Sequence, residues 1–140
     1  MKNTEYRITD LIPQRPPIIM VDKIVFCDDK TTITKFFIKS DNIFCYNNKF
    51  REPGLIENIA QSAAARAGFL NKQKNGRPEI GFIGSIKDLT IYFLPDANSE
   101  ITTEITFVGE VLDFTIIAGK TICNDKTVAE CEMRIFIKHE

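Results

Sequence analysis

The residue with the clearest potential for chemistry is Glu57, a carboxylate inside a strongly apolar segment. The segment from Gly54 to Gly68 reads GLIENIAQSAAARAG and has the composition of a long helix. Gln61 follows four residues after Glu57, so the two side chains lie one above the other on that helix. A carboxyl group set among alanines is a candidate general acid or, once ionised, a base. The structural alternative is an acid near a helix start, where the macrodipole favours negative charge.

Few other side chains in the sequence are suited to catalysis. The single histidine, His139, stands next to the chain end, where residues usually fray. The four cysteines lack C-x-x-C spacing, which disfavours zinc ligation, and we expect them to be small buried apolar residues. They are Cys27, Cys45, Cys123 and Cys131. We therefore expect no metal.

The helix carrying Glu57 is predicted to run from Pro53 or Gly54 to Asn71, and residues 75–78 (NGRP) end it. Apolar residues recur at the spacing of one helical face, which predicts that this face is buried. They are Ile56, Ile59, Ala60, Ala63, Ala67 and Leu70.

The rest of the chain is rich in β signals. A helical turn is predicted over residues 8–12, a strand over 18–21, and a hairpin from runs 20–27 and 31–39, whereas 40–53 is predicted to be irregular. Four further strands are predicted at 80–94, 100–109, 114–123 and 127–138, with a tight turn at Asn124-Asp125. Alternation in the last run points Ala129, Cys131, Met133, Ile135 and Ile137 to one face.

Composition sets the broad class. The 140 residues are predicted to form one domain over 1–140, an α+β fold in which a mostly antiparallel sheet curves around the helix. A net charge of −1 disfavours nucleic-acid binding, and no apolar run is long enough to span a membrane. The first residues lack the apolar stretch of a signal peptide, so we expect a cytoplasmic protein.

Three segments resemble one family. Residues 11–24 (LIPQRPPIIMVDKI) resemble the L-P-H-R-x-P-x-L-L-V-D-R motif of hotdog-fold 3-hydroxyacyl-ACP dehydratases, and residues 57–64 (ENIAQSAA) resemble their central helix. Residues 81–87 (GFIGSIK) are similar to the strand that follows that helix. The nearest likeness is to the dehydratase-like proteins of aryl polyene and flexirubin-type pigment pathways.

The resemblance implies a hotdog fold, a sheet wrapped around one long central helix, and a dimer that is either homomeric or heteromeric. It implies an acyl thioester substrate, carried on the phosphopantetheine of acyl carrier protein or on CoA, with no other cofactor. Glu57 would protonate the departing hydroxyl, and the amides of Gly54, Leu55 and Ile56 would polarise the thioester carbonyl. The candidates for lining the acyl tunnel are Met20, Phe82, Ile83 and Phe93, although core residues would look the same in the sequence.

The sequence departs from the family where the catalytic histidine is expected. The family has a G-H-F-P-G loop before the helix, whereas residues 46–54 here read YNNKFREPG, with Asn48 or Lys49 in place of histidine. Gln14 replaces the histidine of the first motif. Asparagine cannot act as a base, and a lysine in a polar loop is a poor one at neutral pH.

Three functions remain open. The first is a dehydratase-like protein that uses Glu57 with another base or contributes half of a mixed active site. The second is a thioesterase in which Glu57 and Gln61 activate water, and the third is a non-catalytic subunit that pairs with a catalytic hotdog protein. Gln61 either holds Glu57 or is satisfied at a dimer interface. Arg15, Arg51 and Arg66 could attract phosphopantetheine, but solvated surface arginines are the preferred interpretation.

Overall fold

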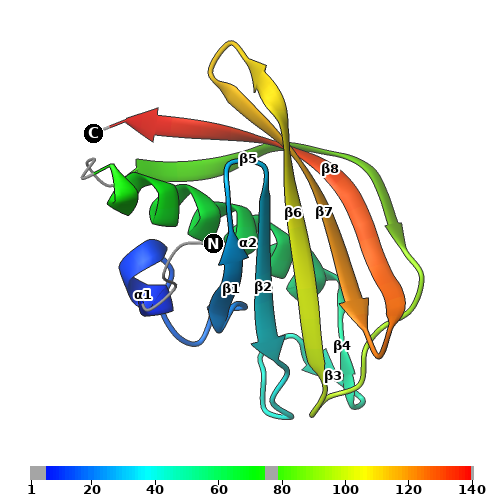
Figure 1. Ribbon diagram of the computed structural model, residues 1–140. Helices are drawn as coiled ribbons and strands as arrows, with labels where there is room; N and C mark the ends of the chain where they lie inside the picture. The colour runs from blue at the N-terminus through cyan, green and yellow to red at the C-terminus, as the bar shows by residue number, and fades with distance from the viewer. Residues whose placement is uncertain (1–5, 75–78, 140) are drawn as a thin grey trace.

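The computed structural model describes the backbone of residues 6–74 and 79–139, and the side chains of residues 6–74 and 81–136. One long helix, α2, lies against a curved six-stranded antiparallel sheet with strand order β1-β2-β6-β7-β8-β5 (Figure 1). The helices are α1 (Ile8–Leu11) and α2 (Glu52–Gln73), and a separate small hairpin pairs β3 (Cys45–Tyr46) with β4 (Lys49–Phe50). The sheet strands are β1 (Lys23–Cys27), β2 (Thr31–Phe37), β5 (Glu79–Ile91), β6 (Glu100–Val111), β7 (Phe114–Cys123) and β8 (Lys126–His139). The predicted α+β hotdog fold is confirmed.

Turn residues explain the hairpins that join the strands. Asn124 and Asp125 between β7 and β8 have φ values of 51° and 64°, a left-handed conformation that Asn and Asp tolerate better than most residues. In the turn between β1 and β2, the carboxylate of Asp28 accepts the backbone N–H groups of Lys30 and Thr31. Both predicted hairpins are therefore present.

Two segments before α2 differ from the prediction. Residues 18–21 are not a strand, and β1 begins only at Lys23, because the backbone of this segment is bonded by side chains of α2 rather than by a neighbouring strand. Residues 40–53 are not irregular throughout, since they contain the β3–β4 hairpin and the first two residues of α2. The helix ends at Gln73, two residues beyond the predicted Asn71, whereas residues 75–78 lie outside the described residues.

The helix approaches the sheet and the segments around it closely because glycines stand at the contacts. A Cβ on Gly119 of β7 would lie 2.5 Å from Ile59 of α2, and one on Gly54 would lie 2.5 Å from the ring of Phe50. A Cβ on Gly68 would collide with the backbone carbonyl of Leu11 in α1. At each position a larger side chain would have to displace the atom it meets, which at Gly68 is backbone.

The buried face of α2 is largely different from the predicted one. Ile59 and Ala63 are buried as expected, but Ile56, Ala60, Ala67 and Leu70 are only half-buried. The side facing the sheet and α1 instead buries both polar and apolar residues, which are Leu55, Asn58, Gln61, Ser62, Ala65, Arg66 and Phe69. The prediction was wrong because hydrogen bonds, described below, make the polar side chains compatible with burial.

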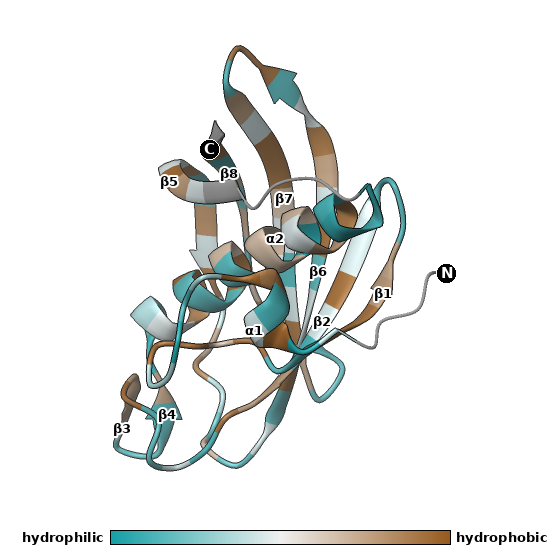
Figure 2. Ribbon diagram, turned by 90° about the vertical axis from the view of Figure 1, so that its left-hand side faces the viewer, coloured by the Kyte–Doolittle hydropathy of each residue, from teal (hydrophilic) through white to brown (hydrophobic). Residues whose placement is uncertain are grey.

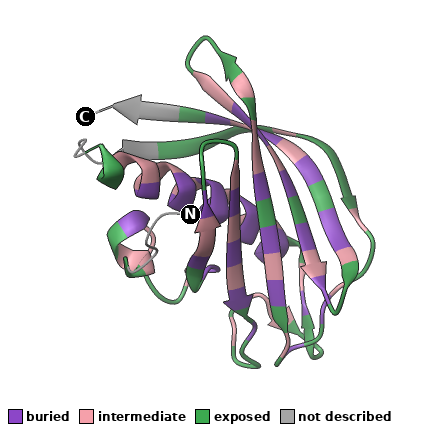
Figure 3. Ribbon diagram, viewed as in Figure 1, coloured by how far each residue is buried: buried purple, intermediate pink, exposed green. Residues whose placement is uncertain are grey.

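Burial elsewhere follows the strand pattern (Figure 3). In β8, Ala129, Cys131, Met133 and Ile135 are buried as predicted, whereas the side chain of Ile137 lies outside the described residues. All four cysteines are free; Cys27, Cys123 and Cys131 are buried, and Cys45 is half-buried. Burial raises the pKa of the Cys131 thiol to about 11, which makes it an unreactive apolar residue at neutral pH.

Candidate active site

A groove of about 1350 Å³ is lined by α2, by residues 9–15 and by residues of β5 to β8. Figure 2 shows α2 in front of the sheet, with α1 beside it. Its helix wall includes several small residues, and its sheet wall combines apolar residues with the charged residues Glu110 and Asp113. The helix wall includes Glu57, Ala60, Ala63, Ala64, Ala67 and Gly68, and the sheet wall includes Gly81, Phe82, Ile83, Ile117 and Ile135. From Glu57 to Leu70 the helix rises by about 20 Å. The groove thus presents apolar surface beside Glu57 over this length.

Glu57 is half-buried at the groove and is held by Gln61, as predicted from their spacing. The amide Nε2 of Gln61 donates to Oε1 of Glu57 over 2.8 Å and to the carbonyl of Ile18 over 2.9 Å. Both amide hydrogens are thereby used. Because Oε1 of Glu57 accepts a hydrogen bond, Oε2 is the better position for an acid proton.

Gln61 itself is wholly buried, with an exposed fraction of 0%. Its Oε1 accepts the backbone N–H of Met20 over 2.6 Å, while Asn58 donates from Nδ2 to the carbonyl of Met20 over 2.7 Å. Gln61 and Asn58 therefore bond both the N–H and the carbonyl of Met20. These bonds hold the segment that begins at Ile18 beside the helix, and they orient the Gln61 amide toward Glu57.

The same polar layer continues into the sheet. Thr103 donates to Oδ1 of Asn58 over 2.6 Å, and the hydroxyls of Thr103 and Thr121 lie 2.8 Å apart. Thr103 has one hydroxyl hydrogen, which Asn58 takes, so Thr121 must be the donor in the second bond. Sequence analysis missed this network; the signal available was an Asn three residues before a Gln in an alanine-rich helix.

The amides predicted to polarise the carbonyl, at the start of α2, do not line the groove as Glu57 does. The N–H groups of Gly54 and Leu55 both donate to the carbonyl of Arg51, over 2.9 and 3.3 Å. The N–H of Ile56 lies within the helix, where regular geometry directs it to the carbonyl four residues earlier. Among the described residues that line the groove, none is one of these three. Their role in polarising a carbonyl stays a prediction.

Phe82 and Ile83 lie near the start of β5 and line the groove with Glu57. They are 52% and 40% exposed, so neither is an ordinary core residue in this chain. β5 is the last strand of the sheet and pairs only with β8 among the described strands. The structure thus places Glu57, Phe82 and Ile83 along one groove, with Gln61 bonded to Glu57, and their part in binding substrate remains a prediction.

The segment expected to hold the catalytic histidine forms a tight hairpin. Asn47 and Asn48, with φ values of 51° and 63°, make the two-residue turn between β3 and β4. Lys49 forms an ion pair with Asp96 over 2.5 Å, and the carbonyl of Asn48 accepts the N–H of Ala97. Of the described residues that line the groove, none belongs to this hairpin. Asn48 and Lys49 therefore lie outside the groove that Glu57 of the same chain lines.

The three arginines are engaged in different ways. Arg15 donates to the carbonyls of Thr9, Ile12 and Gln14 and so braces the segment after α1. Arg51 pairs with Glu52 over 3.4 Å. Arg66 is buried, contrary to the preferred surface interpretation, because its Nη2 donates to the carbonyl of Asp29 and its guanidinium lies 5.7 Å from the ring centre of Phe107.

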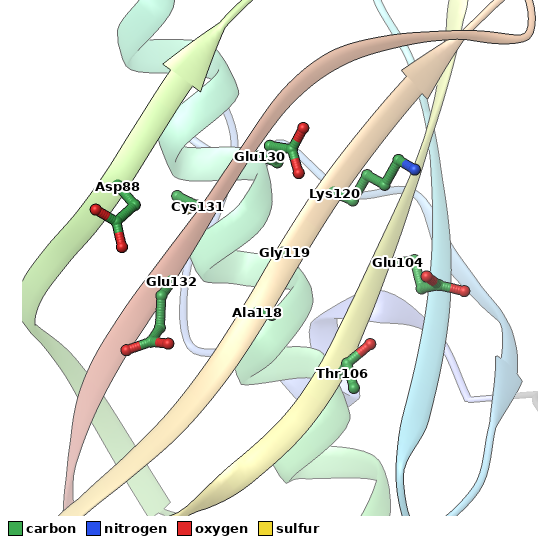
Figure 4. A pocket seen from close by; sticks show the side chains of 9 residues that line it. All are labelled: Asp88, Glu104, Thr106, Ala118, Gly119, Lys120, Glu130, Cys131 and Glu132. Atoms are coloured by element: carbon green, nitrogen blue, oxygen red, sulfur yellow. The ribbon is translucent and has the colours of Figure 1, made fainter.

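A smaller depression of about 360 Å³ lies on the outer face of the sheet, with the strands between it and α2 (Figure 4). Lys120 stands there between its cross-strand neighbours Glu104 and Glu130. This lining is charged and solvated, unlike the apolar surface that an acyl chain requires. Within residues 6–74 and 79–139, no group of His, Cys, Asp and Glu side chains has the arrangement of a metal site. No helix in these ranges is long and apolar enough to cross a membrane.

A helix enclosed by an antiparallel sheet, with a carboxylate facing an apolar groove beside the last strand, defines a hotdog-fold protein of the acyl-thioester class. The family model described as ApeP-like, ApeP dehydratase, matches residues 6–140. The chain belongs to this family of dehydratases, which confirms the resemblance drawn from its motifs. A search of curated protein sequences found no match.

Solved structures agree on the fold. The dehydratase heterocomplex ApeI:P from Xenorhabdus doucetiae is similar with a TM-score of 0.89 and 11% identity, over 96% of this chain and 93% of that chain. A hypothetical thioesterase from Streptococcus pneumoniae matches with a TM-score of 0.65 and 10% identity, over 84% of this chain and 90% of that chain. The PaaI protein of E. coli matches with a TM-score of 0.66 and 9% identity, over 81% and 80%.

Proposed function

We propose that this chain is the acid-bearing subunit of a composite active site that dehydrates 3-hydroxyacyl thioesters, with a second hotdog protein supplying the base. The observation that carries the proposal is the Glu57 carboxyl, which Gln61 holds at the groove, whereas Asn48 and Lys49 of the same chain lie in a hairpin outside that groove. Membership of the ApeP-like dehydratase family supports the reaction class.

The proposed reaction balances with one base and one acid. The base removes a proton from C2 of the 3-hydroxyacyl thioester, and the electrons of that C–H bond form the C2–C3 double bond. The C3–O bond breaks as Glu57 transfers its proton to the departing hydroxyl, which leaves as water. The product is a 2-enoyl thioester, and Glu57 regains a proton from solvent before the next turnover.

The need for a partner follows from the residues around Glu57. Histidine suits proton removal at neutral pH, but the only histidine of the chain is His139, whose side chain lies outside the described residues. The groove is open beside β5, so a second subunit placed along this strand would bring its own side chains to Glu57. The similar Xenorhabdus structure is described as a dehydratase heterocomplex, which supports a heteromeric arrangement.

Thioester hydrolysis is the alternative for the same carboxylate, because an ionised Glu57 could activate water without a histidine. Gln61 has no amide hydrogen left to orient that water, since both are bonded to Ile18 and Glu57. This geometry favours Gln61 as a residue that positions Glu57. In the third alternative, this chain pairs with a catalytic subunit and takes no part in the chemistry.

One set of incubations separates these functions. This chain, a histidine-bearing hotdog protein encoded in the same genome, and their mixture are each given 3-hydroxyacyl and saturated acyl thioesters of acyl carrier protein and of CoA. Absorbance of the enoyl product reports water loss, and a thiol reagent reports hydrolysis. We expect this chain alone to do neither and the mixture to dehydrate faster than the partner alone. Thiol release from the saturated thioester by this chain would instead assign a thioesterase.

A further inference from the structure

The tip of the β6–β7 hairpin, residues 108–113, has an unusual composition for an exposed turn. Leu112 is 92% exposed, and Val108 and Val111 are also exposed. Figure 1 shows this hairpin extending beyond the rest of the sheet. Exposed aliphatic residues occur singly on most proteins, but a group of three on one projecting turn indicates a contact surface.

Leu112 also has an unfavourable backbone conformation, with φ at 56°. The other two-residue hairpin turns place Asn47-Asn48 and Asn124-Asp125 at positive φ, residue types that tolerate it. Leucine does not, and it gains no buried contact here in return. Asparagine would adopt this conformation more easily than leucine. A contact with another molecule therefore explains the exposed leucine better than the stability of the isolated chain does.

The hairpin tip continues the surface that borders the candidate active site. Leu112 lines the same groove as Glu57, together with Phe82 at the start of β5. Across β5, β8 and β7, Phe82 pairs in register with Phe136 and Phe136 with Phe114, which directly follows the tip. The rings of Phe114 and Phe136 lie 5.8 Å apart. By strand alternation these two rings lie on the outer face of the sheet, opposite Ile135, so the tip borders the groove through Leu112 and an aromatic row through Phe114.

Charge distinguishes between possible occupants of this surface. Glu110 and Asp113 flank Leu112 and also line the groove, and residues 107–114 (FVGEVLDF) contain no lysine or arginine. Two carboxylates beside the exposed leucine disfavour an anionic lipid surface, which attracts basic segments. They suit a protein surface with an apolar pocket bordered by cationic side chains.

We propose that the hairpin tip docks onto the partner hotdog subunit, with Leu112 in an apolar pocket of that subunit, and that this contact determines which partner is accepted. The inference rests on the proposed composite site, since a partner that reaches Glu57 from the open side of the groove must also meet the tip. The chemical class of the partner is thus a hotdog protein with a base and a basic rim around an apolar pocket.

Association of this chain with the histidine-bearing hotdog protein of the same genome tests the proposal by sedimentation and calorimetry. Leu112→Asn relieves the backbone strain and removes the aliphatic contact, so the melting temperature of the isolated chain is expected to hold or rise while Kd for the partner increases at least tenfold. The matched control is Ile43→Asn, which removes an aliphatic side chain that is 50% exposed and lies in the loop before β3. It is expected to leave Kd unchanged.

The outcomes separate the two proposals. If the unchanged chain fails to bind the partner, the composite site itself fails, and the docking proposal fails with it. If it binds and Leu112→Asn binds equally well, only the docking proposal is overturned. If Leu112→Asn abolishes self-association but leaves partner binding intact, the surface belongs to a second copy of this chain, which also overturns the proposal.

Discussion

The two sides of helix α2 depart from the usual pattern of a surface helix. The side that faces the sheet and the N-terminal segment buries the polar residues Asn58, Gln61 and Ser62, each with its hydrogen-bonding partner. The side that faces the groove carries Ala60, Ala64 and Ala67, which are only half-buried. An amphipathic helix normally buries its apolar side and exposes its polar side.

The difference shows how one helix serves two purposes. Directional hydrogen bonds on the buried side fix the helix against Met20 and Thr103, so that Glu57 is held in a defined orientation at the border between the two sides. Small apolar residues on the other side leave a groove that a chain or a partner can fill. The buried polar groups position Glu57, and we propose that the exposed apolar groups bind the substrate or the partner.

The largest effect on stability is expected from Asn58→Leu. This substitution leaves the Met20 carbonyl and the Thr103 hydroxyl buried without their present partner, and each such loss costs about 1–3 kcal/mol. We expect the free energy of unfolding to fall by about 4 kcal/mol in urea titrations. Ala64→Ser on the groove side is the matched control, and a loss beyond about 0.5 kcal/mol there would remove the contrast between the two sides.

A smaller, pH-dependent effect is expected from Cys131, which packs in the apolar layer with Ile59 and Ala63. Burial raises its pKa from an ordinary value of 9.0 to about 11, so the folded chain keeps the thiol proton where the unfolded chain loses it. The stabilisation is complete below pH 9 and is lost as pH rises toward 11. It amounts to about 2–3 kcal/mol.

This stabilisation is measured by comparing the unfolding free energies of the unchanged chain and of Cys131→Ala at pH 8 and at pH 11. The unchanged chain should lose about 2 kcal/mol more than the variant over this interval. Equal losses in both proteins would show that the thiol is not buried as the fold requires.

The smallest effect on stability is expected from Ala67→Leu on the groove side. Leucine has a helix propensity close to that of alanine, and the half-buried position offers space, so the unfolding free energy should change by less than about 1 kcal/mol. The added side chain fills part of the groove. In the active complex, kcat/KM for long acyl chains should fall roughly tenfold or more relative to short ones, and equal effects on both lengths would exclude this wall from chain binding.

Much of this arrangement follows from local patterns in the sequence. The period of two in β8, the Asn-Asp turn after β7 and the spacing of Glu57 and Gln61 all report interactions between near neighbours. The buried side of α2 was mispredicted because its polar residues are satisfied by Met20, Thr34 and Thr103, from distant segments. Strand 18–21 was mispredicted for the same reason, since its backbone bonds to Asn58 and Gln61 rather than to another strand.

The loop that replaces the histidine motif shows what local sequence patterns do not predict, namely where a turn lies in the fold. The sequence revealed that histidine is absent, but not that Asn47 and Asn48 close a two-residue hairpin away from the groove. Positive φ at two successive asparagines is a local signal, and an N-N pair between short β-forming residues could have predicted the turn. The position of that turn relative to Glu57 depends on the packing of the whole fold.

The most direct test of the account is the dehydration rate of the complex that contains Glu57→Gln. Glutamine keeps the shape and can still accept the Gln61 hydrogen bond, but it has no acid proton to transfer. With partner binding and melting temperature unchanged, we expect formation of the 2-enoyl thioester to slow by about 100-fold to 10,000-fold. A rate equal to that of the unchanged complex would contradict the assignment of Glu57 as the acid of a composite active site.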